Sequence, residues 1–242
     1  MAILTVLWEK WVEFRREWLR ITMTSLIAPL LYILTFGIGL GSQMTVGGRP
    51  YLEFLIPGVV ALTTMNSSFQ AVGMSLNVQR LYERSFDNIM ISPTPLWQYV
   101  LGQMIGGSLR GFYAGSLVLL LSLPLGLNLC ITPGFFLVML LNGMAFAALG
   151  VMAAVLSKTH AGISRFSSFV ITPMSFLCGT FFSMEGPLTR LIDALPLTQT
   201  AVLLRSIAWG EGVELWRIAV LMGYNAVFLI VTIVTIERMK NV

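Results

Sequence analysis

Six long apolar stretches constrain the fold of this chain more than any other feature of its sequence. Each is close to the roughly twenty apolar residues that a helix needs to cross a bilayer. Only 11% of the residues are charged and 56% are hydrophobic, whereas soluble domains carry about 25% charged residues. The sequence therefore predicts an all-α integral membrane protein with six transmembrane helices, near residues 21–41, 54–76, 98–122, 133–156, 166–183 and 214–236.

The segment before the first stretch, residues 4–20, has the pattern of an amphipathic helix. Its apolar residues, three tryptophans among them, recur at steps of three and four, and its charged residues take the other face. Because tryptophan favours the headgroup boundary, we expect an interfacial helix that lies flat on the membrane. A helix that packs on a soluble partner is the alternative.

The region around the fifth stretch is less regular than the others. This stretch is the shortest and contains Pro173, so we expect it to be broken or tilted. Residues 184–213 follow it and contain Pro187, Pro196 and apolar pieces too short to cross a bilayer. Such pieces are typical of re-entrant or interfacial helices, which need protein or water over their ends. We expect short helices of this kind on the outer side, before the last span.

The distribution of Lys and Arg predicts the orientation, because short cytoplasmic loops are enriched in these residues. With the N-terminus inside, ten of the fifteen lie on the cytoplasmic side, four on the outer side, and Arg110 within a span. We therefore expect a multi-pass protein of the inner or plasma membrane with both termini in the cytoplasm. The chain has no long basic run, so nucleic acid is not an expected partner.

The polar linker between the second and third spans, residues 79–95, is longer than a simple connection requires. It carries four charges and an apolar stripe, and it ends in Ser92-Pro93-Thr94-Pro95, where proline stops a helix. The linker has room for about two helical turns across the cytoplasmic face. An exposed amphipathic helix of this kind is either a docking element for a soluble partner or a surface helix on lipid headgroups.

Arg110 lies about a dozen residues into the third span, near the middle of the membrane. A guanidinium there costs several kcal/mol unless it is paired or hydrated, so it faces the bundle or a wet cavity. It is either a residue of a pathway or interface, or a strut bonded to carbonyls or to Asn66, Gln70 or Asn142. The sequence offers no obvious acid within the spans as its partner.

The third span also contains five glycines in overlapping GxxxG spacings, which let two helix backbones approach closely. They pack within one bundle or form a contact between subunits, and they are Gly102, Gly106, Gly107, Gly111 and Gly115.

Two further features concern the outer boundary. Pro57-Gly58 is expected to bend the second span, since proline removes a backbone donor, and the bend serves either gating or ordinary packing. Phe181, Phe182 and two tryptophans, Trp209 and Trp216, fall near the outer surface. They are typical of an aromatic belt, or they contact an amphipathic substrate.

Several classes of function are excluded by the residues present. The single histidine, His160, permits no histidine-based metal site or catalytic triad within the membrane. The chain has no GxxxxGK[ST] loop, so it is not itself a P-loop ATPase. Its acids lie at or outside the span ends, unlike those of proton-coupled carriers, and neither a channel filter nor a polar-lined span is recognised. The sequence indicates a membrane protein whose energy source lies elsewhere, and not an enzyme.

Several short motifs, in order along nearly the whole chain, resemble those of the type-2 ABC exporter permeases (the ABC-2 type), in the branch of Nod-factor export and YadH-like permeases. The entry to the second span is similar to the family pattern Y-x-x-F-L-x-P-G, and Arg110-Gly111 is similar to its Arg-Gly. The other matching segments are 84–93, Phe181-Phe182-Ser183, 195–198 and Arg205. Gly186-Pro187 departs from the family, whose members often have Leu-Pro there, and puts the helix arrangement of that outer segment in doubt.

The resemblance implies that residues 1–242 form a single transmembrane domain, the permease subunit of an ATP-driven exporter. Two ATP-binding subunits, which hold ATP and Mg, and a second permease copy would be its partners, besides membrane lipids, and the chain itself would bind no cofactor. Residues 83–90 would form a coupling helix. The expected coupling residues are Arg80, Glu83, Arg84, Phe86, Asp87, Asn88, Met90, Ser92 and Pro93. The expected translocation or interface residues are Pro57, Gly58, Gly107, Arg110, Gly111, Phe181 and Phe182.

The substrate expected from the family is amphipathic, lipid-linked, saccharide or drug-like, and it would leave the cytoplasm or the inner leaflet. A secondary carrier or a membrane scaffold without an ATPase partner is the alternative. An intramembrane enzyme is disfavoured, because histidine and buried acids are missing from the spans.

Overall fold

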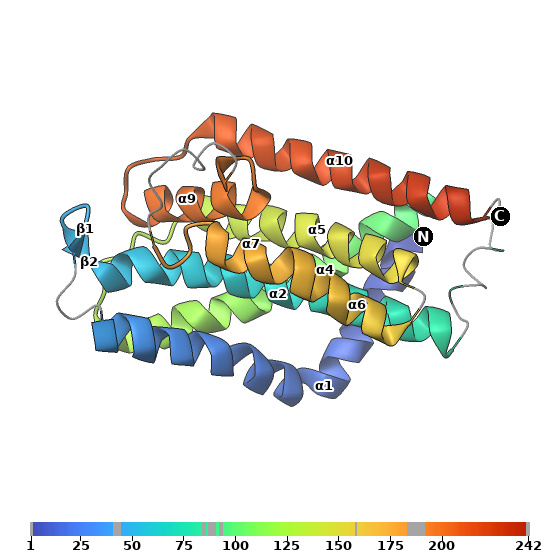
Figure 1. Cartoon of the computed structure of the whole chain (residues 1–242), viewed down its shortest axis with the longest axis horizontal. Helices are drawn as coiled ribbons and strands as arrows, with labels where there is room; N and C mark the ends of the chain where they lie inside the picture. Colours follow the sequence, from blue (N-terminus) through green and yellow to red (C-terminus); the bar gives the residue numbers. More distant parts are fainter. Residues whose placement is uncertain are drawn as a thin grey trace.

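The computed structural model describes residues 2–40, 45–83, 86, 91, 94–157, 159–182 and 192–240. Long, roughly parallel helices dominate it (Figure 1). The α-helices are α1 (Ala2–Tyr32), α2 (Tyr51–Leu81), α4 (Leu96–Ser122), α5 (Pro133–Leu156), α6 (His160–Phe166), α7 (Thr172–Leu177), α9 (Pro196–Ala208) and α10 (Leu215–Lys240). The other elements are the π-helices η1 (Ile33–Leu40) and η4 (Ser167–Ile171), the 3-10 turn η3 (Leu123–Leu125), and the strands β1 (Thr45–Val46) and β2 (Arg49–Pro50).

The core of the protein is formed by α2, α4 and α5, which pack against one another along most of their length. Glycines bring the three backbones together. A Cβ atom on Gly107 would lie 2.7 Å from the Ala147 side chain, and one on Gly150 would lie 2.8 Å from the Phe69 carbonyl oxygen. Because the glycines themselves add no side chain at these points, the helices approach closely, and α2 is buried on most of its surface. The other helices pack around this core.

Within the described residues, five helices are long and apolar enough to cross a membrane. Helix α5 has the bounds expected from the sequence, and α4 begins two residues before the predicted third span. Helix α2 extends three residues before and five after the predicted second span. The five segments are Ile3–Gly37, Tyr51–Leu81, Leu96–Leu125, Pro133–Leu156 and Leu215–Arg238.

The predicted fifth span corresponds to three short pieces, α6, η4 and α7, which follow one another from His160 to Leu177. Pro173 lies in the first turn of α7, directly after η4, where the helical bonding changes from π to α. The pieces are not among the five long apolar helices, so a sixth crossing is not established by helix length. The last of the long helices, α10, ends at the same end of the bundle at which α1 begins (Figure 1).

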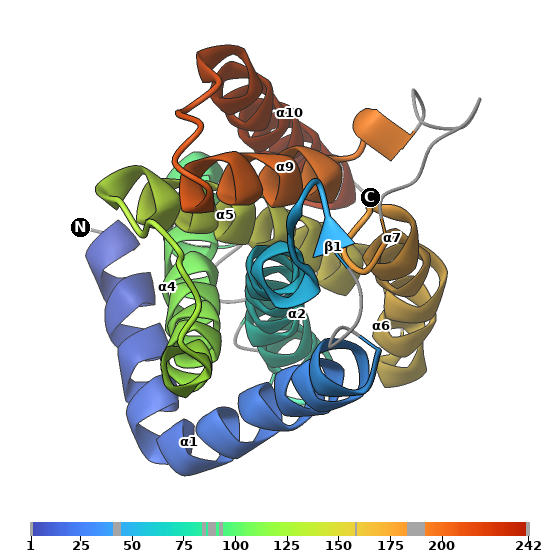
Figure 2. The ribbon, with the colours of Figure 1, turned by 90° about the vertical axis from the view of Figure 1, so that its left-hand side faces the viewer.

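Helix α1 unites the predicted interfacial helix and the predicted first span in one continuous helix. Its ribbon bends sharply, with a first arm beside α4 and a second arm that runs below α2 (Figure 2). Thr22 Oγ1 donates to the Trp18 carbonyl at 2.7 Å, and Thr24 Oγ1 donates to the Arg20 carbonyl at 2.8 Å. Threonine hydroxyls that bond four residues back bend helices. The bend therefore has a local cause in the sequence.

We expect Gly111→Ala to destabilise the protein by about 1–3 kcal/mol, the usual cost of overpacking a core. The added methyl group would overlap Ser68 Oγ and lie 2.7 Å from the Thr64 carbonyl oxygen. Thermal unfolding of the detergent-solubilised protein measures this. Gly223→Ala in α10 is the matched control, because no described atom lies within 4 Å of its Cβ position. Equal melting temperatures for the two variants would contradict the close approach of α4 and α2.

Candidate functional site

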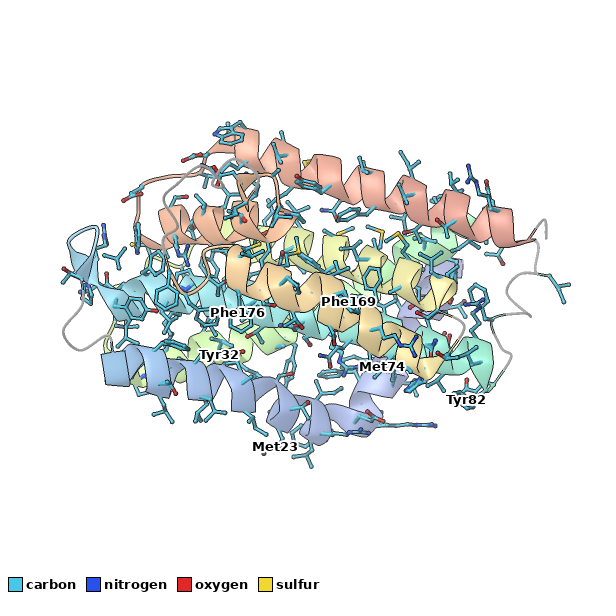
Figure 3. All side chains as sticks on the ribbon, viewed as in Figure 1. Met23, Tyr32, Met74, Tyr82, Phe169 and Phe176 are labelled. Carbon is cyan, nitrogen blue, oxygen red and sulfur yellow. The ribbon has the colours of Figure 1, made fainter. Side chains whose placement is uncertain are left out.

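A groove runs between α1 and α2, which contact each other little compared with the core helices. Three adjoining cavities form it, with volumes of about 430, 1030 and 300 Å³, and the side chain of Arg110 borders all three. Met74 and Tyr32 lie on its inner side, whereas Met23 projects from the opposite side of α1 (Figure 3). We call these three cavities together the α1–α2 groove.

The three cavities differ in chemistry. The first is mainly apolar and is lined by Leu7, Trp11 and Phe14 of α1 and by residues of α4. The second is the largest and is lined by many charged residues of both signs, among them Glu17 and Arg20. The third lies beside the second arm of α1 and is lined mostly by uncharged polar groups. A single groove therefore offers an apolar wall, a charged entrance and a polar end.

Helix α2 contributes a polar stripe to the third cavity, formed by Thr63, Asn66, Ser67 and Gln70. Their spacing of three, one and three residues places them on one face of the helix. No polar-lined span was recognised in the sequence, although these four residues of α2 form one. The signal was present, because polar residues at helical spacing within an apolar span indicate a wet or protein-covered face.

Arg110 is held by an acid that the sequence analysis did not find. Its Nη1 atom lies 3.8 Å from Glu13 Oε1, in the first arm of α1. The other oxygen of Glu13 accepts hydrogen bonds from Lys10 Nζ at 3.0 Å and from Ser75 Oγ at 3.1 Å. The carboxylate was placed at the membrane surface, whereas the bend in α1 brings it against α2 and α4.

The three polar residues suggested as partners of Arg110 lie in two places. Asn66 and Gln70 line the third cavity together with Arg110. Asn142 faces the core instead, where its Nδ2 donates to the Ala61 carbonyl at 3.0 Å and its Oδ1 accepts from Thr200 Oγ1 at 3.0 Å. Arg110 is thus both paired with an acid and exposed to the groove. Both interpretations of this residue, as part of a pathway and as a strut within the bundle, therefore stay open.

The glycine stripe of α4 is covered on both sides by this chain. Gly102 and Gly106 face α1, where a Cβ would lie 2.9 Å from Val6 Cβ and 2.8 Å from Lys10 Cγ. The other three glycines face side chains or carbonyls of α2 and α5. These contacts favour packing within one bundle over a contact between subunits.

Pro57 and Gly58 lie where α2 meets the outer segment. Proline has no N–H for the carbonyl of Glu53, four residues earlier, and Trp209 Nε1 donates to that carbonyl at 3.3 Å. At Gly58, a Cβ would lie 2.7 Å from Arg205 Nη2. The dipeptide therefore makes room for side chains that attach α9 to α2.

Arg205 of α9 joins three elements at this end. Its Nε donates to the Phe54 carbonyl at 3.0 Å, and its Nη2 donates to the carbonyls of Gly179 at 2.7 Å and Thr180 at 2.9 Å. The guanidinium also lies 3.7 Å from the centre of the Phe54 ring. Burial lowers the pKa of Arg205 from its usual value, and the three carbonyl oxygens oppose this by favouring the charged form.

The two phenylalanines expected at the outer boundary differ in exposure. Phe181 is 2% exposed, packs edge-to-face on Tyr32, and its carbonyl accepts a hydrogen bond from Tyr51 Oη at 2.8 Å. Phe182 is 57% exposed. Phe181 is thus part of the core, whereas Phe182 and the exposed Trp216 are available to lipid or substrate.

Of the nine predicted coupling residues, three lie among the described residues. Arg80 donates to the carbonyls of Ala154, Val155 and Ser157 at the end of α5. Glu83 is exposed and borders the second cavity, and Phe86 is buried against Tyr99. Six lie outside the described residues: Arg84, Asp87, Asn88, Met90, Ser92 and Pro93.

The model of the family described as "ABC-2 type transporter" matches residues 1–209. The chain belongs to this family. It is 28% identical to the inner membrane transport permease YadH of Escherichia coli (strain K12) over 183 residues, which cover 74% of this chain and 70% of that protein. It is 27% identical to nodulation protein J of Bradyrhizobium diazoefficiens over 217 residues, 84% of this chain and 81% of that protein. Nodulation protein J of Neorhizobium galegae is 30% identical over 217 residues, covering 84% and 82%.

The resemblance drawn from the sequence is therefore confirmed, and so is the assignment to membrane transport. The family match and the five long apolar helices together support a multi-pass membrane protein. Its relatives are named as a transport permease and as nodulation proteins, and not as enzymes.

We expect Arg205→Ala to expose Cys178, which follows α7 immediately before the two carbonyls that Arg205 binds. Cys178 is buried and Cys130 is exposed in the native protein. Without the guanidinium, three buried carbonyls lose a charged donor, at a cost of about 1–3 kcal/mol for each unsatisfied group. Maleimide labelling in detergent, with mass spectrometry of the two cysteines, reports the change.

In this assay Cys130 reacts in every variant and serves as the internal standard. Arg20→Ala in α1 is the control, because it removes an exposed arginine that is paired with Glu17 of the same helix. An Arg205→Ala protein whose Cys178 stays unreactive would show that α7 and α9 are held by other contacts.

Proposed function

We propose that this chain is the transmembrane permease subunit of an ATP-driven exporter. Its substrate is an amphipathic, lipid-linked, saccharide or drug-like molecule that leaves the cytoplasm or the inner leaflet. The observation that carries this proposal is the α1–α2 groove, which gives a member of the ABC-2 type transporter family a polar path inside its membrane region. Because the chain contains no P-loop motif, the energy comes from two separate ATP-binding subunits that hold ATP and Mg.

The end of the bundle that carries the start of α1 and the end of α10 faces the cytoplasm in this proposal (Figure 1). The Lys and Arg distribution supports it. Residues 79–95 leave α2 at this same end and dock on the ATP-binding subunit. Arg80 supports the docking segment from the protein side, because its bonds to the carbonyls at the end of α5 fix the last turn of α2.

The remaining crossing is made by α6, η4 and α7, which follow one another along the chain from His160 to Leu177. Eighteen helical residues span about 27 Å, close to the hydrocarbon thickness of a bilayer. Helix α9 is then the re-entrant helix, supported by its near-complete burial against α2 and α5. With this crossing the protein has six spans.

A second copy of the chain completes the transporter. Large apolar side chains are exposed on the second arm of α1 and on the crossing formed by α6, η4 and α7, including Ile27, Leu31, Phe169 and Phe176. The second arm of α1 and this crossing lie on the same side of the bundle (Figure 2), so a homodimer formed through their exposed faces would enclose the α1–α2 groove. Membrane lipids cover the apolar faces that the second copy leaves free.

A pull-down of the detergent-solubilised chain from its native membrane, followed by mass spectrometry and an ATPase assay, tests the proposal. We expect a P-loop ATPase to co-purify in stoichiometric amount. The double charge reversal Glu83→Lys with Arg84→Glu removes it while membrane insertion stays normal, because the docking segment loses its charge pattern.

The matched control is Glu214→Lys with Arg217→Glu, which reverses an ion pair at the opposite end of the bundle. It should keep the ATPase. A chain that purifies alone, with no ATPase and no effect of residues 83 and 84, would instead support a secondary carrier or a scaffold.

A further inference from the structure

We infer that the α1–α2 groove binds an amphiphile with an anionic headgroup, and that Arg110 is the residue that binds the anion. This inference rests on the proposed function and names the chemistry of its substrate. It comes from the position of Arg110 at the junction of the three cavities. The charge, the neighbouring donors and the shape of the groove each support it.

The charge of the third cavity is set by Arg110 alone. Among the described residues that line it, no other is charged. The acids nearest to Arg110, Glu13 and Glu17, lie in the first arm of α1 and border the charged second cavity instead. The third cavity is therefore electropositive, although the entrance beside it is mixed in charge.

The guanidinium of Arg110 has N–H donors that its contact with Glu13 does not use. Its contact with Glu13 is long, at 3.8 Å, whereas charge-assisted hydrogen bonds are about 2.7–2.9 Å. Its Nε is buried and has no hydrogen-bond partner among the described residues. A buried donor without a partner costs about 1–3 kcal/mol. Because the side chain is 24% exposed and borders the third cavity, its other N–H groups can reach an oxyanion there.

Uncharged polar groups surround the same position. Ser25 of α1 and Asn66 and Gln70 of α2 line the third cavity, and each carries at least one N–H or O–H donor. A phosphate or carboxylate group accepts from several donors at once, and guanidinium geometry matches both anions. The cavity, of about 300 Å³, is large enough for such a headgroup.

An apolar tail fits the neighbouring cavity. The first cavity, of about 430 Å³, shares Arg110 with the third and is lined by Trp11, Phe14 and Leu109. A molecule with an anionic head and an acyl chain can place its head at Arg110 and its chain against these side chains. A free anion would leave the apolar cavity empty, and a neutral lipid would add no anion to the long contact that the guanidinium makes with Glu13.

Native mass spectrometry of the full-length chain tests this inference without an ATPase. The probe is dioctanoyl phosphatidic acid, and dioctanoylglycerol is the neutral probe with the same tails. We expect the wild-type chain to bind the anionic probe about tenfold more tightly, as for one charge-assisted contact. Arg110→Gln abolishes this preference, whereas Arg110→Lys keeps part of it because the charge remains.

Two further variants keep the test decisive. Glu13→Gln with Arg110→Gln removes both charges, so that a failure to fold through one unpaired charge is avoided. Arg238→Gln in α10 removes an exposed positive charge elsewhere and should keep the preference. A folded Arg110→Gln protein that retains the tenfold preference would overturn the inference, even if an ATPase co-purifies and the proposed function stands.

Competition distinguishes the two sources of an anion. Excess unlabelled dioctanoyl phosphatidic acid should displace the isotope-labelled form of the same lipid. Millimolar inorganic phosphate should not displace it, because phosphate does not fill the apolar cavity. Displacement by phosphate at the same concentration would assign the site to a free anion and overturn the amphiphile. If no ATPase co-purifies in the pull-down but the lipid preference is intact, the inferred binding site stands and only the proposed ATP-driven function is contradicted.

Discussion

The close approach of the α2, α4 and α5 backbones is the constraint on which the rest of this structure depends. Glycines on α4 and α5 leave room only for the side chain or backbone of the neighbouring helix, as at Gly107 and Gly150. Helix α2 is consequently enclosed by its neighbours on most faces. The polar stripe of α2, formed by Thr63, Asn66, Ser67 and Gln70, lies on a side of the helix that faces α1. The groove is thus a consequence of how the core packs.

The two ends of the bundle are held in different ways. At one end, a buried guanidinium satisfies backbone carbonyls of separate elements, and an indole takes the carbonyl that Pro57 leaves without a helical donor. These bonds are short, directional and shielded from water, which makes them effective. Toward the other end, the first arm of α1 is held by Lys10, Glu13 and Ser75, whose network is partly exposed. Water weakens partly exposed ion pairs, so this attachment is the looser one.

Much of the fold could be predicted from the sequence, because hydrophobic length decides where a helix crosses a membrane. Helix α5 shows this, with both of its bounds as expected. The site was harder to predict, because it depends on which helix faces meet. Arg110 was recognised as costly within a span, but its partner Glu13 lies 97 positions away and across a bend. The role of Arg205 was equally hidden, since three carbonyls carry no sequence signal. Six of the nine predicted coupling residues in the segment 79–95 lie outside the described residues, so its docking role stays a prediction.

The continuity of α1 has a mechanical consequence. The arm that begins near the chain start and the arm that borders the third cavity are one helix, with unbroken backbone hydrogen bonding across the bend. Such a helix transmits a movement of one arm to the other. The second arm contributes Ser25, Ala28 and Tyr32 to the lining of the third cavity. The width of the polar passage is therefore tied to the position of the arm that lies nearest the membrane surface.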